Sequence, residues 1–128
     1  MYIRMNGVPV QDQDRALTFY TEILGFQVKH NIPVGEYKWL TVVSPKEPDA
    51  AELLLEPISF EETKVYQKSL YEKKIPWTQF QVDSIEAEYE RLSKLGVQFG
   101  MKPTNVGTAI VLTLDDTCGN FIQLIEML

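Results

Sequence analysis

The first regular pattern of apolar and polar positions in this chain lies between Asp12 and Val28. Apolar side chains recur there at i, i+3, i+4, i+7 and i+8, a spacing that places them on one face of a helix. These positions are Ala16, Phe19, Tyr20, Ile23 and Leu24. Asp12 is placed to cap the helix N-terminus, and Gly25 is placed to end the helix, as glycine commonly does. The pattern therefore predicts a capped amphipathic helix, followed by a strand that begins at Phe26.

A shorter version of this pattern recurs at Asp83–Phe99, where the sequence reads DSIEAEYERLSKLGVQF. Gly25 and Gly96 are 71 residues apart, and the same offset relates Asp12 to Asp83. Asp83 is accordingly predicted to cap the second helix. Two copies are too few, and their separation is too long, for a solenoid repeat. The pattern therefore indicates a duplication inside one domain.

The remaining stretches complete two similar halves. Alternating or β-branched segments predict strands at residues 3–10, 37–43, 51–56, 77–82, 97–99, 108–114 and 120–127. The composition of 51–56 also allows a helix, but its shortness and the following Pro57 favour a strand. The sequence SFEE at 59–62 matches a capping box and predicts a short helix to about residue 73. Residues 100–107 are predicted to be a loop, which could act as a lid.

Each half then reads strand, helix, strand, strand, strand. This order predicts an α+β fold class built from two tandem βαβββ modules. We expect a single domain over residues 1–128, with module one at about 1–57, a linker helix at about 58–75 and module two at about 76–128.

The composition narrows the range of partners. The net charge of −6 argues against nucleic acid or an anionic membrane surface. No apolar run approaches the roughly 20 residues of a membrane span, and the N-terminus lacks the pattern of a signal peptide. Cys118 is the single cysteine, so an internal disulfide is impossible. These features lead us to expect a cytoplasmic protein.

Two motifs now support a resemblance to a known family. With the doubled βαβββ order, FYTEILGF after the first cap and DDTCGNFIQLIE near the end resemble the vicinal oxygen chelate superfamily. That group includes glyoxalase I, extradiol dioxygenases and the fosfomycin- and bleomycin-resistance proteins. The resemblance covers nearly the whole chain. It implies cupped mixed sheets with helices on the outside and a ligand site in the cup.

The resemblance also implies where metal ligands would lie. The four positions are occupied here by Met5, Leu54, Trp77 and Gln123. Methionine, leucine and tryptophan do not supply the ligands that divalent ions use in such sites, and a lone amide oxygen is too little. A shift of two residues would replace Leu54 by Glu52 or Glu56, which share its face of the strand. Even then the set is too small, so no metal and no other cofactor is expected.

Strand alternation suggests which side chains could instead hold a ligand. Trp77, Gln79 and Gln81 share one face of their strand, and the resemblance turns that face into the cup. Tryptophan and glutamine there suit a cavity that stacks a flat molecule and hydrogen-bonds to it, although Trp77 could equally fill the cavity itself. The candidate ligand-binding residues are Met5, Trp39, Leu54, Glu56, Trp77, Gln79 and Gln123.

Other reactive side chains are weaker candidates. Glu56 is the one residue proposed as a general base, should burial in the cup raise its pKa; a solvated carboxylate at the rim is the simpler alternative. Glu126 is predicted on the opposite face from Gln123. His30 is the only histidine and lies near a predicted loop, without a second histidine as a partner. Cys118 follows two aspartates, which disfavour the thiolate that a nucleophile needs.

Two functional hypotheses follow. In the first, the chain is a metal-free binding protein, like the bleomycin-resistance branch, that sequesters or senses a small apolar or aromatic molecule. In the second, it is a glyoxalase-type lyase or isomerase, or a dioxygenase, with a divalent metal. The ligand positions favour the first hypothesis, while whether any reaction is catalysed stays open. The resemblance also implies a homodimer.

Overall fold

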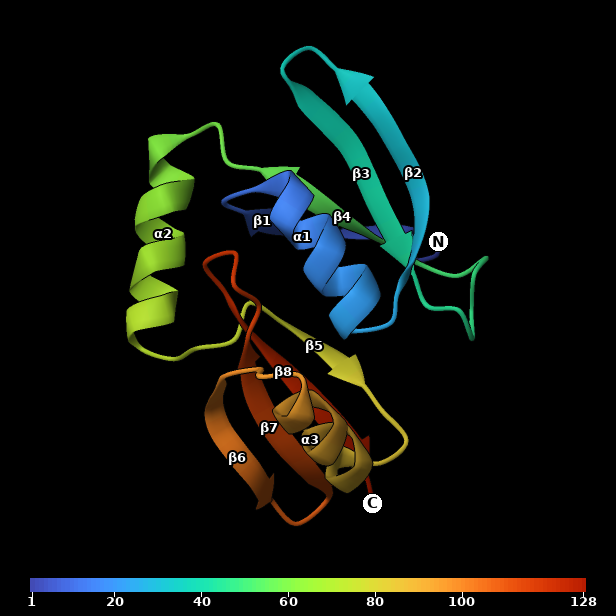
Figure 1. Cartoon of the computed structure of the whole chain (residues 1–128), viewed down its shortest axis with the longest axis vertical. Coiled ribbons are helices and arrows are strands. Elements are labelled where there is room, and N and C mark those ends of the chain that lie inside the picture. The colour runs from blue at the N-terminus through green and yellow to red at the C-terminus, as the bar shows by residue number, and fades with distance from the viewer. The chain divides into compact units, whose positions relative to one another are not determined.

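The computed structural model describes the whole chain, Met1–Leu128, and has an α+β architecture. Eight strands form two four-stranded sheets, each with parallel and antiparallel neighbours (Figure 1). The chain divides into unit 1, Met1–Tyr66, and unit 2, Gln67–Leu128. The boundary falls inside α2 (Glu61–Glu72), the predicted linker helix. The predicted fold class and its two modules are thus confirmed.

Unit 1 forms the first βαβββ module. Its elements are β1 (Met5–Val10), α1 (Gln13–Thr18), the π-helix η1 (Phe19–Ile23), β2 (Gln27–Val34), β3 (Tyr37–Val43) and β4 (Glu52–Pro57). The strand order is β1-β4-β3-β2, with β1 and β4 parallel and the other neighbours antiparallel. The long crossover between parallel strands is needed because parallel neighbours cannot be joined by a tight hairpin.

Unit 2 repeats this arrangement. Its elements after α2 are β5 (Thr78–Gln81), α3 (Ile85–Lys94), β6 (Phe99–Asn105), β7 (Ala109–Asp115) and β8 (Phe121–Met127). The order β5-β8-β7-β6 matches that of unit 1, with β5 and β8 as the parallel pair. The sequence repeat therefore corresponds to a structural repeat.

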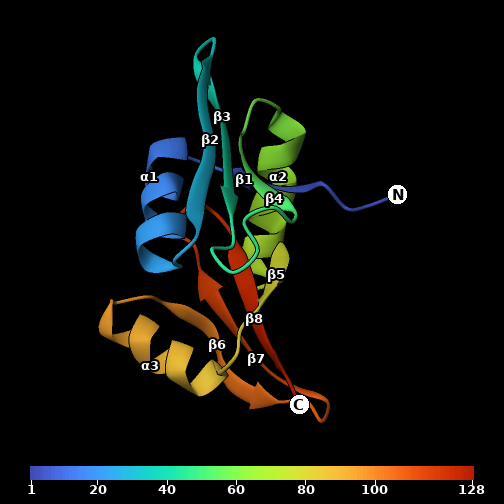
Figure 2. The same cartoon turned by 90° about the vertical axis from the view of Figure 1, so that its right-hand side faces the viewer.

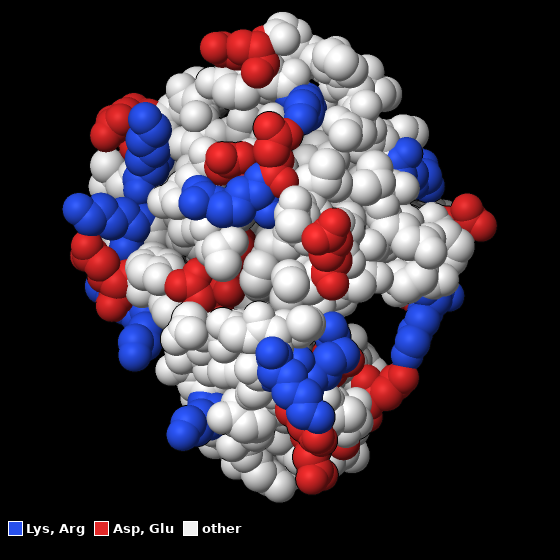
Figure 3. Space-filling model, viewed as in Figure 1, with Lys and Arg blue, Asp and Glu red and all other residues white.

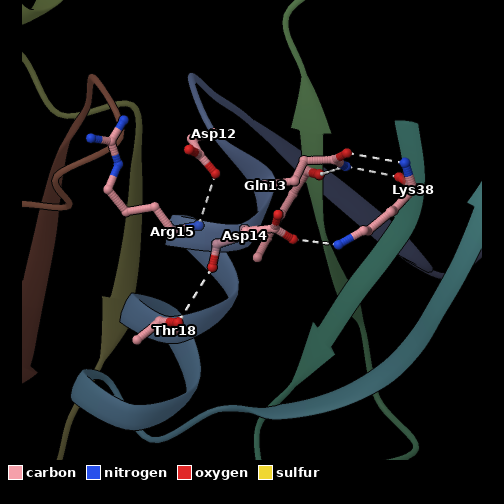
Figure 4. A network of polar contacts seen from close by, with 7 residues as sticks. Asp12, Gln13, Asp14, Arg15, Thr18 and Lys38 are labelled. Atoms are coloured by element: carbon pink, nitrogen blue, oxygen red, sulfur yellow. Dashed lines mark hydrogen bonds and ion pairs between the residues drawn. The ribbon is translucent and has the colours of Figure 1, made fainter. Parts of the chain in front are cut away.

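The two module helices begin differently from the prediction. Asp12 caps α1, and its Oδ1 accepts a hydrogen bond of 3.0 Å from the Arg15 amide (Figure 4). That backbone hydrogen bond lowers the pKa of Asp12. In unit 2, Ser84 rather than Asp83 is the cap, since its Oγ accepts from the Ala87 amide at 3.1 Å. The prediction for Asp83 was wrong by one residue.

The π-helix η1 explains this error. A π-turn inserts one extra residue into a helix. The first helix therefore needs 13 residues from its cap at Asp12 to Gly25, whereas the second needs 12 from Ser84 to Gly96. Both glycines have positive φ, +89° and +80°, as expected where a helix ends in the left-handed region. The offset between modules is thus 71 residues after η1 and 72 before it.

The core of unit 1 lies between α1–η1 and one face of its sheet. Ala16, Phe19 and Tyr20 are buried on the helix side. The buried sheet residues are Val8, Val10, Leu40, Val42, Leu53 and Leu55. Gln13 joins helix to sheet: its Nε2 donates to the Lys38 and Leu55 carbonyls at 2.8 and 3.0 Å, and its Oε1 accepts from the Lys38 amide at 3.0 Å (Figure 4).

The core of unit 2 is built the same way. Ile85 and Leu92 of α3 are buried, and α3 contacts β6, β7 and β8. Figure 2 shows α3 on one side of these strands, as α1 lies on one side of β2 and β3 in its own unit. Glu126 accepts a hydrogen bond from the Ile85 amide at 2.8 Å. Its carboxylate thus binds the positive N-terminal end of α3, on the side predicted for it.

Residues 100–107 do not form the predicted loop. Most of them belong to β6, which pairs with β7 and carries two register shifts, between Phe99 and Met101 and between Met101 and Thr104. Bulges and Pro103 are tolerated because β6 is an edge strand, where backbone groups on one side need no strand partner. The lid predicted for this segment is therefore wrong. His30, expected near a loop, likewise lies within β2.

The turn between β7 and β8 has an internal polar network. Asp116 is fully buried and accepts hydrogen bonds from the amides of Cys118 and Asn120 at 2.8 and 3.0 Å. Gln67 of α2 donates to Asn120 Oδ1 at 3.1 Å. Cys118 is also fully buried. Its thiol therefore has a structural place in this turn and lacks the exposure of a reactive cysteine.

The charged surface is mixed in sign. In Figure 3, Lys and Arg side chains lie interspersed with Asp and Glu on the face shown. Several are paired along a helix, such as Arg91 with Glu88 at 2.7 Å and Lys94 with Glu90 at 3.0 Å. Such exposed pairs contribute little to stability. None of the helices is long and apolar enough to cross a membrane.

Candidate functional site

Each sheet has a far face, by which we mean the face turned away from α1 in unit 1 or from α3 in unit 2. Strand alternation and the register of the pairs assign side chains to it. Unit 1 contributes Met5, Gly7, Pro9, His30, Ile32, Trp39, Thr41, Val43, Glu52, Leu54 and Glu56. Unit 2 contributes Trp77, Gln79, Gln81, Met101, Val111, Thr113, Asp115, Phe121, Gln123 and Ile125. All seven predicted ligand-binding residues lie on a far face of their own unit.

The two far faces carry equivalent rows of side chains across the strands. In unit 1, Gly7, Leu54, Thr41 and His30 follow one another across β1, β4, β3 and β2. In unit 2 the equivalent row is Gln79, Gln123, Thr113 and Met101 across β5, β8, β7 and β6. Thr41 and Thr113 are therefore equivalent residues of the two modules.

Glu52 is the polar centre of the far face in unit 1. It is only 4% exposed, and its Oε1 accepts a hydrogen bond of 2.8 Å from the Thr41 hydroxyl. The Arg4 guanidinium lies 3.5 Å from Oε2, and His30 Nε2 lies 3.7 Å from Oε1. A carboxylate can be buried only with such partners. Sequence reasoning reached Glu52 only as an alternative to Leu54; its alternation with Leu54 and a threonine on the next strand were the available signals.

Glu56 lies on the same face, two positions further along β4. A Cβ atom added to Gly7 would meet its Oε1 at 2.0 Å, so the carboxylate lies directly over this glycine. Glu56 is exposed, and it forms no hydrogen bond or ion pair with the rest of the chain. The sequence prediction of a carboxylate on this face is compatible with its position.

The far face of unit 2 combines aromatic and amide side chains. Gln123 Nε2 donates to Gln79 Oε1 at 2.5 Å, so the two amides predicted to orient a ligand bind each other. Trp77 precedes β5 and donates its backbone N–H to the Phe121 carbonyl at 2.8 Å, which continues the parallel pairing. Trp77 and Gln123 are half-buried, while Gln79 is exposed.

Tyr71 of α2 covers one end of this face. Its ring stacks on Phe121 with centroids 4.7 Å apart and planes inclined by 18°. Its hydroxyl donates to Asp115 Oδ2 at 2.5 Å. This hydrogen bond, together with burial and the nearby carboxylates, raises the pKa of Tyr71 to about 12. Sequence reasoning missed Tyr71 because nothing in the periodicity of α2 indicates which sheet residue it contacts.

The residues at the implied metal positions do not fit a divalent ion. Met5 and Leu54 in unit 1, and Trp77 in unit 2, offer no suitable donor, and the Gln123 amide already bonds Gln79. No three His, Cys, Asp or Glu side chains are grouped so that they could hold a metal ion. Glu52 and His30 approach each other, but Arg4 and Thr41 occupy the same carboxylate. The donor set supplies no metal chemistry.

Comparison with known proteins places this architecture. The family model described as the glyoxalase/bleomycin resistance protein/dioxygenase superfamily matches residues 3–124. Protein YurT of Bacillus subtilis (strain 168) is 46% identical over 126 residues, covering 98% of this chain and 99% of YurT. The crystal structure of UcmS2 is 33% identical with a TM-score of 0.84, and covers 98% of each chain.

A second solved structure is similar in fold. TnmS3, described as an antibiotic binding protein from Streptomyces sp. CB03234, is 24% identical with a TM-score of 0.78, covering 100% of this chain and 97% of TnmS3. The doubled βαβββ architecture and the family match over nearly the whole chain agree with the resemblance seen in the two sequence motifs. The chain belongs to the glyoxalase/bleomycin resistance protein/dioxygenase superfamily.

Proposed function

We propose that this protein binds a small, flat apolar or aromatic molecule without a metal ion, using the far faces of its sheets. The observation that carries the proposal is the pairing of a partly exposed tryptophan with polar groups on each far face. Trp39 is 39% exposed on the face that holds Glu52, and the half-buried Trp77 shares its face with the Gln79–Gln123 pair. Aromatic walls with a few placed polar groups are typical of small-molecule sites.

The role would be sequestration or sensing of the ligand, as in the bleomycin-resistance branch of the family. TnmS3, which shares the fold, is described as an antibiotic binding protein. The fold is thus suited to binding without a catalytic metal. Met5, Leu54 and Glu56 would contribute the remaining contacts in unit 1, with Met5 and Leu54 packing against the ligand and Glu56 orienting a polar group.

Binding can be tested by thermal-shift screening of aromatic metabolites and antibiotics, followed by tryptophan fluorescence titration. A ligand at about 100 times its dissociation constant should stabilise the chain by roughly 2.7 kcal/mol. Trp77→Ala should weaken binding far more than Trp77→Phe, because phenylalanine keeps an aromatic face. Equal affinity in Trp39→Ala, Trp77→Ala and the unchanged protein would refute the placement of the ligand on these faces.

The alternative is a glyoxalase-type lyase or isomerase, or a dioxygenase, that uses a divalent metal. It is separated from the first proposal by quantifying metals in protein purified without chelator. We expect well below one metal ion per chain and no change in melting temperature with chelator. About one ion per chain, lost together with stability, would overturn metal-free binding. A metal-independent reaction with Glu56 as base would instead predict turnover that Glu56→Gln abolishes.

The family resemblance further suggests a homodimer. Exposed apolar side chains on β2 and β3, including Ile32 at 51% and Val34 at 60%, support self-association. Light scattering after size exclusion should give twice the monomer mass of 14.7 kDa. A single species at the monomer mass across micromolar concentrations would exclude the dimer.

A cytoplasmic location is also proposed. It is supported by the one cysteine, Cys118, which is free and fully buried. Cell fractionation with an antibody should find the protein in the soluble intracellular fraction, and recovery from the medium or the membrane would refute this.

A further inference from the structure

The Thr113 hydroxyl is an anomaly on the far face of unit 2. Thr113 is 4% exposed, and its Oγ1 is the one buried side-chain nitrogen or oxygen atom in the chain without a hydrogen-bond partner. Folded proteins satisfy nearly all such atoms, because a buried unpaired hydroxyl lowers stability. A group left unpaired in the free protein is a place to look for a bond that forms with something else.

Comparison of the two modules shows how the anomaly arises. The equivalent hydroxyl of Thr41 donates to Glu52, which lies two residues before Leu54 on β4. The residue two positions before Gln123 on β8 is Phe121. The ring of Phe121 has no oxygen to accept the Thr113 proton. Unit 2 therefore keeps the threonine of this pair and lacks its acceptor.

The surroundings of Thr113 are aromatic and uncharged. A Cβ atom at Gly100 would meet both Thr113 Oγ1 and the Phe121 ring at 2.7 Å, so the hydroxyl lies beside that ring. Gln123 is the neighbour in register on β8, and its amide is directed to Gln79. The one charged side chain on this face, Asp115, accepts the Tyr71 hydroxyl. An ion would find no counter-charge in this row, so a neutral ligand fits best.

Unused donors dominate the row. After the Gln123–Gln79 bond, the two amides retain three N–H groups, and Thr113 retains its O–H, since an amide carries two donors and a threonine one. The group that complements several donors beside an aromatic ring is a carbonyl oxygen on a flat ring system. The Thr113 hydroxyl is covered in the free chain, so contact requires a neighbour to move. Gln123, a half-buried side chain held by one amide bond, is the neighbour able to do so.

We propose that Thr113 is a ligand-specificity residue: its hydroxyl donates a hydrogen bond to the carbonyl oxygen of a neutral aromatic ketone, while Gln123 moves aside. This inference rests on the proposed binding function and names the class of ligand. It requires no bond-making chemistry.

The test compares fluorenone with fluorene, two flat molecules of nearly the same size that differ by a carbonyl oxygen. Binding is measured by tryptophan fluorescence and calorimetry on the unchanged protein, Thr113→Val and Thr113→Ser. We expect fluorenone to bind more tightly than fluorene, and Thr113→Val to lower fluorenone affinity about tenfold while leaving fluorene unchanged. Thr113→Ser should retain the preference. Thr78→Val, on the opposite face of the same sheet, serves as the control and should bind both compounds as the unchanged protein does.

A second readout uses the free protein alone. If the hydroxyl lacks a partner before binding, Thr113→Val should raise the melting temperature while it weakens fluorenone binding. A lower melting temperature would show that the hydroxyl is already satisfied, by a water molecule for example, and would overturn the proposal.

The outcomes also separate the two proposals. Equal affinity for fluorenone and fluorene, unaffected by Thr113→Val, would overturn the role of Thr113 and leave small-molecule binding standing. Failure to bind either compound up to millimolar concentration would count against both.

Discussion

The bond between Thr41 and Glu52 offers a direct test of how unit 1 stabilises a buried carboxylate. The Thr41→Val substitution keeps the shape of the side chain and removes the hydroxyl. Thr41 is fully buried, Glu52 is 4% exposed, and the bond length is 2.8 Å. The substitution leaves Glu52 with Arg4 and His30, whose side chains are 69% and 43% exposed and whose contacts are 3.5 and 3.7 Å long. Neither contact can replace the lost donor, because both are long and open to solvent.

The expected magnitude follows from the charge and the burial. A hydrogen bond to a charged, buried group contributes about 1.5–3 kcal/mol. In a chain of this length, that loss should lower the melting temperature by about 5–10 °C. Removing Glu52 as well should recover part of the loss, because both buried polar partners are then gone. Thr41→Val with Glu52→Met should therefore be more stable than the sum of the single variants by about 1–2 kcal/mol.

Urea unfolding followed by circular dichroism measures all four proteins of this cycle. Thr113→Val is a matched control at the equivalent position, where the hydroxyl has no partner, and its stability should change in the opposite direction. A Thr41→Val stability within about 0.5 kcal/mol of the unchanged protein would refute the reasoning. Additive single effects would show instead that the two side chains do not act as a pair.

Three further predictions concern other parts of the chain. Gly7→Ala should cost less than about 1 kcal/mol, since only the flexible, exposed Glu56 must move, whereas Gly100→Ala should cost about 1–3 kcal/mol because the Phe121 ring and Thr113 block it; equal costs in urea unfolding would contradict this. The raised pKa of Tyr71 contributes stability that is present below pH 10 and is lost as pH rises through about 12, so Tyr71→Phe should abolish that dependence in alkaline unfolding, and an unchanged profile would argue against the Asp115 bond. Ser84→Ala should lower the free energy of unfolding by about 1 kcal/mol and Ser84→Thr by less, and equal losses would mean that the hydroxyl does not cap α3.

The fold was predictable because its signals are local and repeated. The i, i+3, i+4 spacing of residues such as Ala16 and Phe19, with Asp12 and Gly25 at the ends, locates the first helix within the sequence itself. Repetition then strengthens each element by its copy. The errors arose where a local rule has two structural solutions: Asp83 failed because of the π-turn in the other helix, and residues 100–107 because proline and glycine also occur in bulged edge strands.

The candidate site was only partly predictable. Alternation assigned Trp77, Gln79 and Gln123 to their face, since strand parity is a property of one segment. The Thr41–Glu52 bond depends on the register of β3 against β4, and the stacking of Tyr71 on Phe121 depends on where α2 docks in unit 2. Neither is encoded in a single stretch of sequence. The missing partner of Thr113 became visible only when the registers of the two modules were compared.

The strands at the ends of each sheet have a consequence for aggregation. Both β2 and β6 contain a proline, Pro33 and Pro103, and both have irregular registers where bulges occur. Such strands present an interrupted row of amide donors, which is a poor template for the backbone of a second chain. Sheet extension and amyloid-like stacking are therefore disfavoured at these edges. Any stable assembly of this protein should be held by side-chain packing between faces, and should dissociate reversibly on dilution rather than grow.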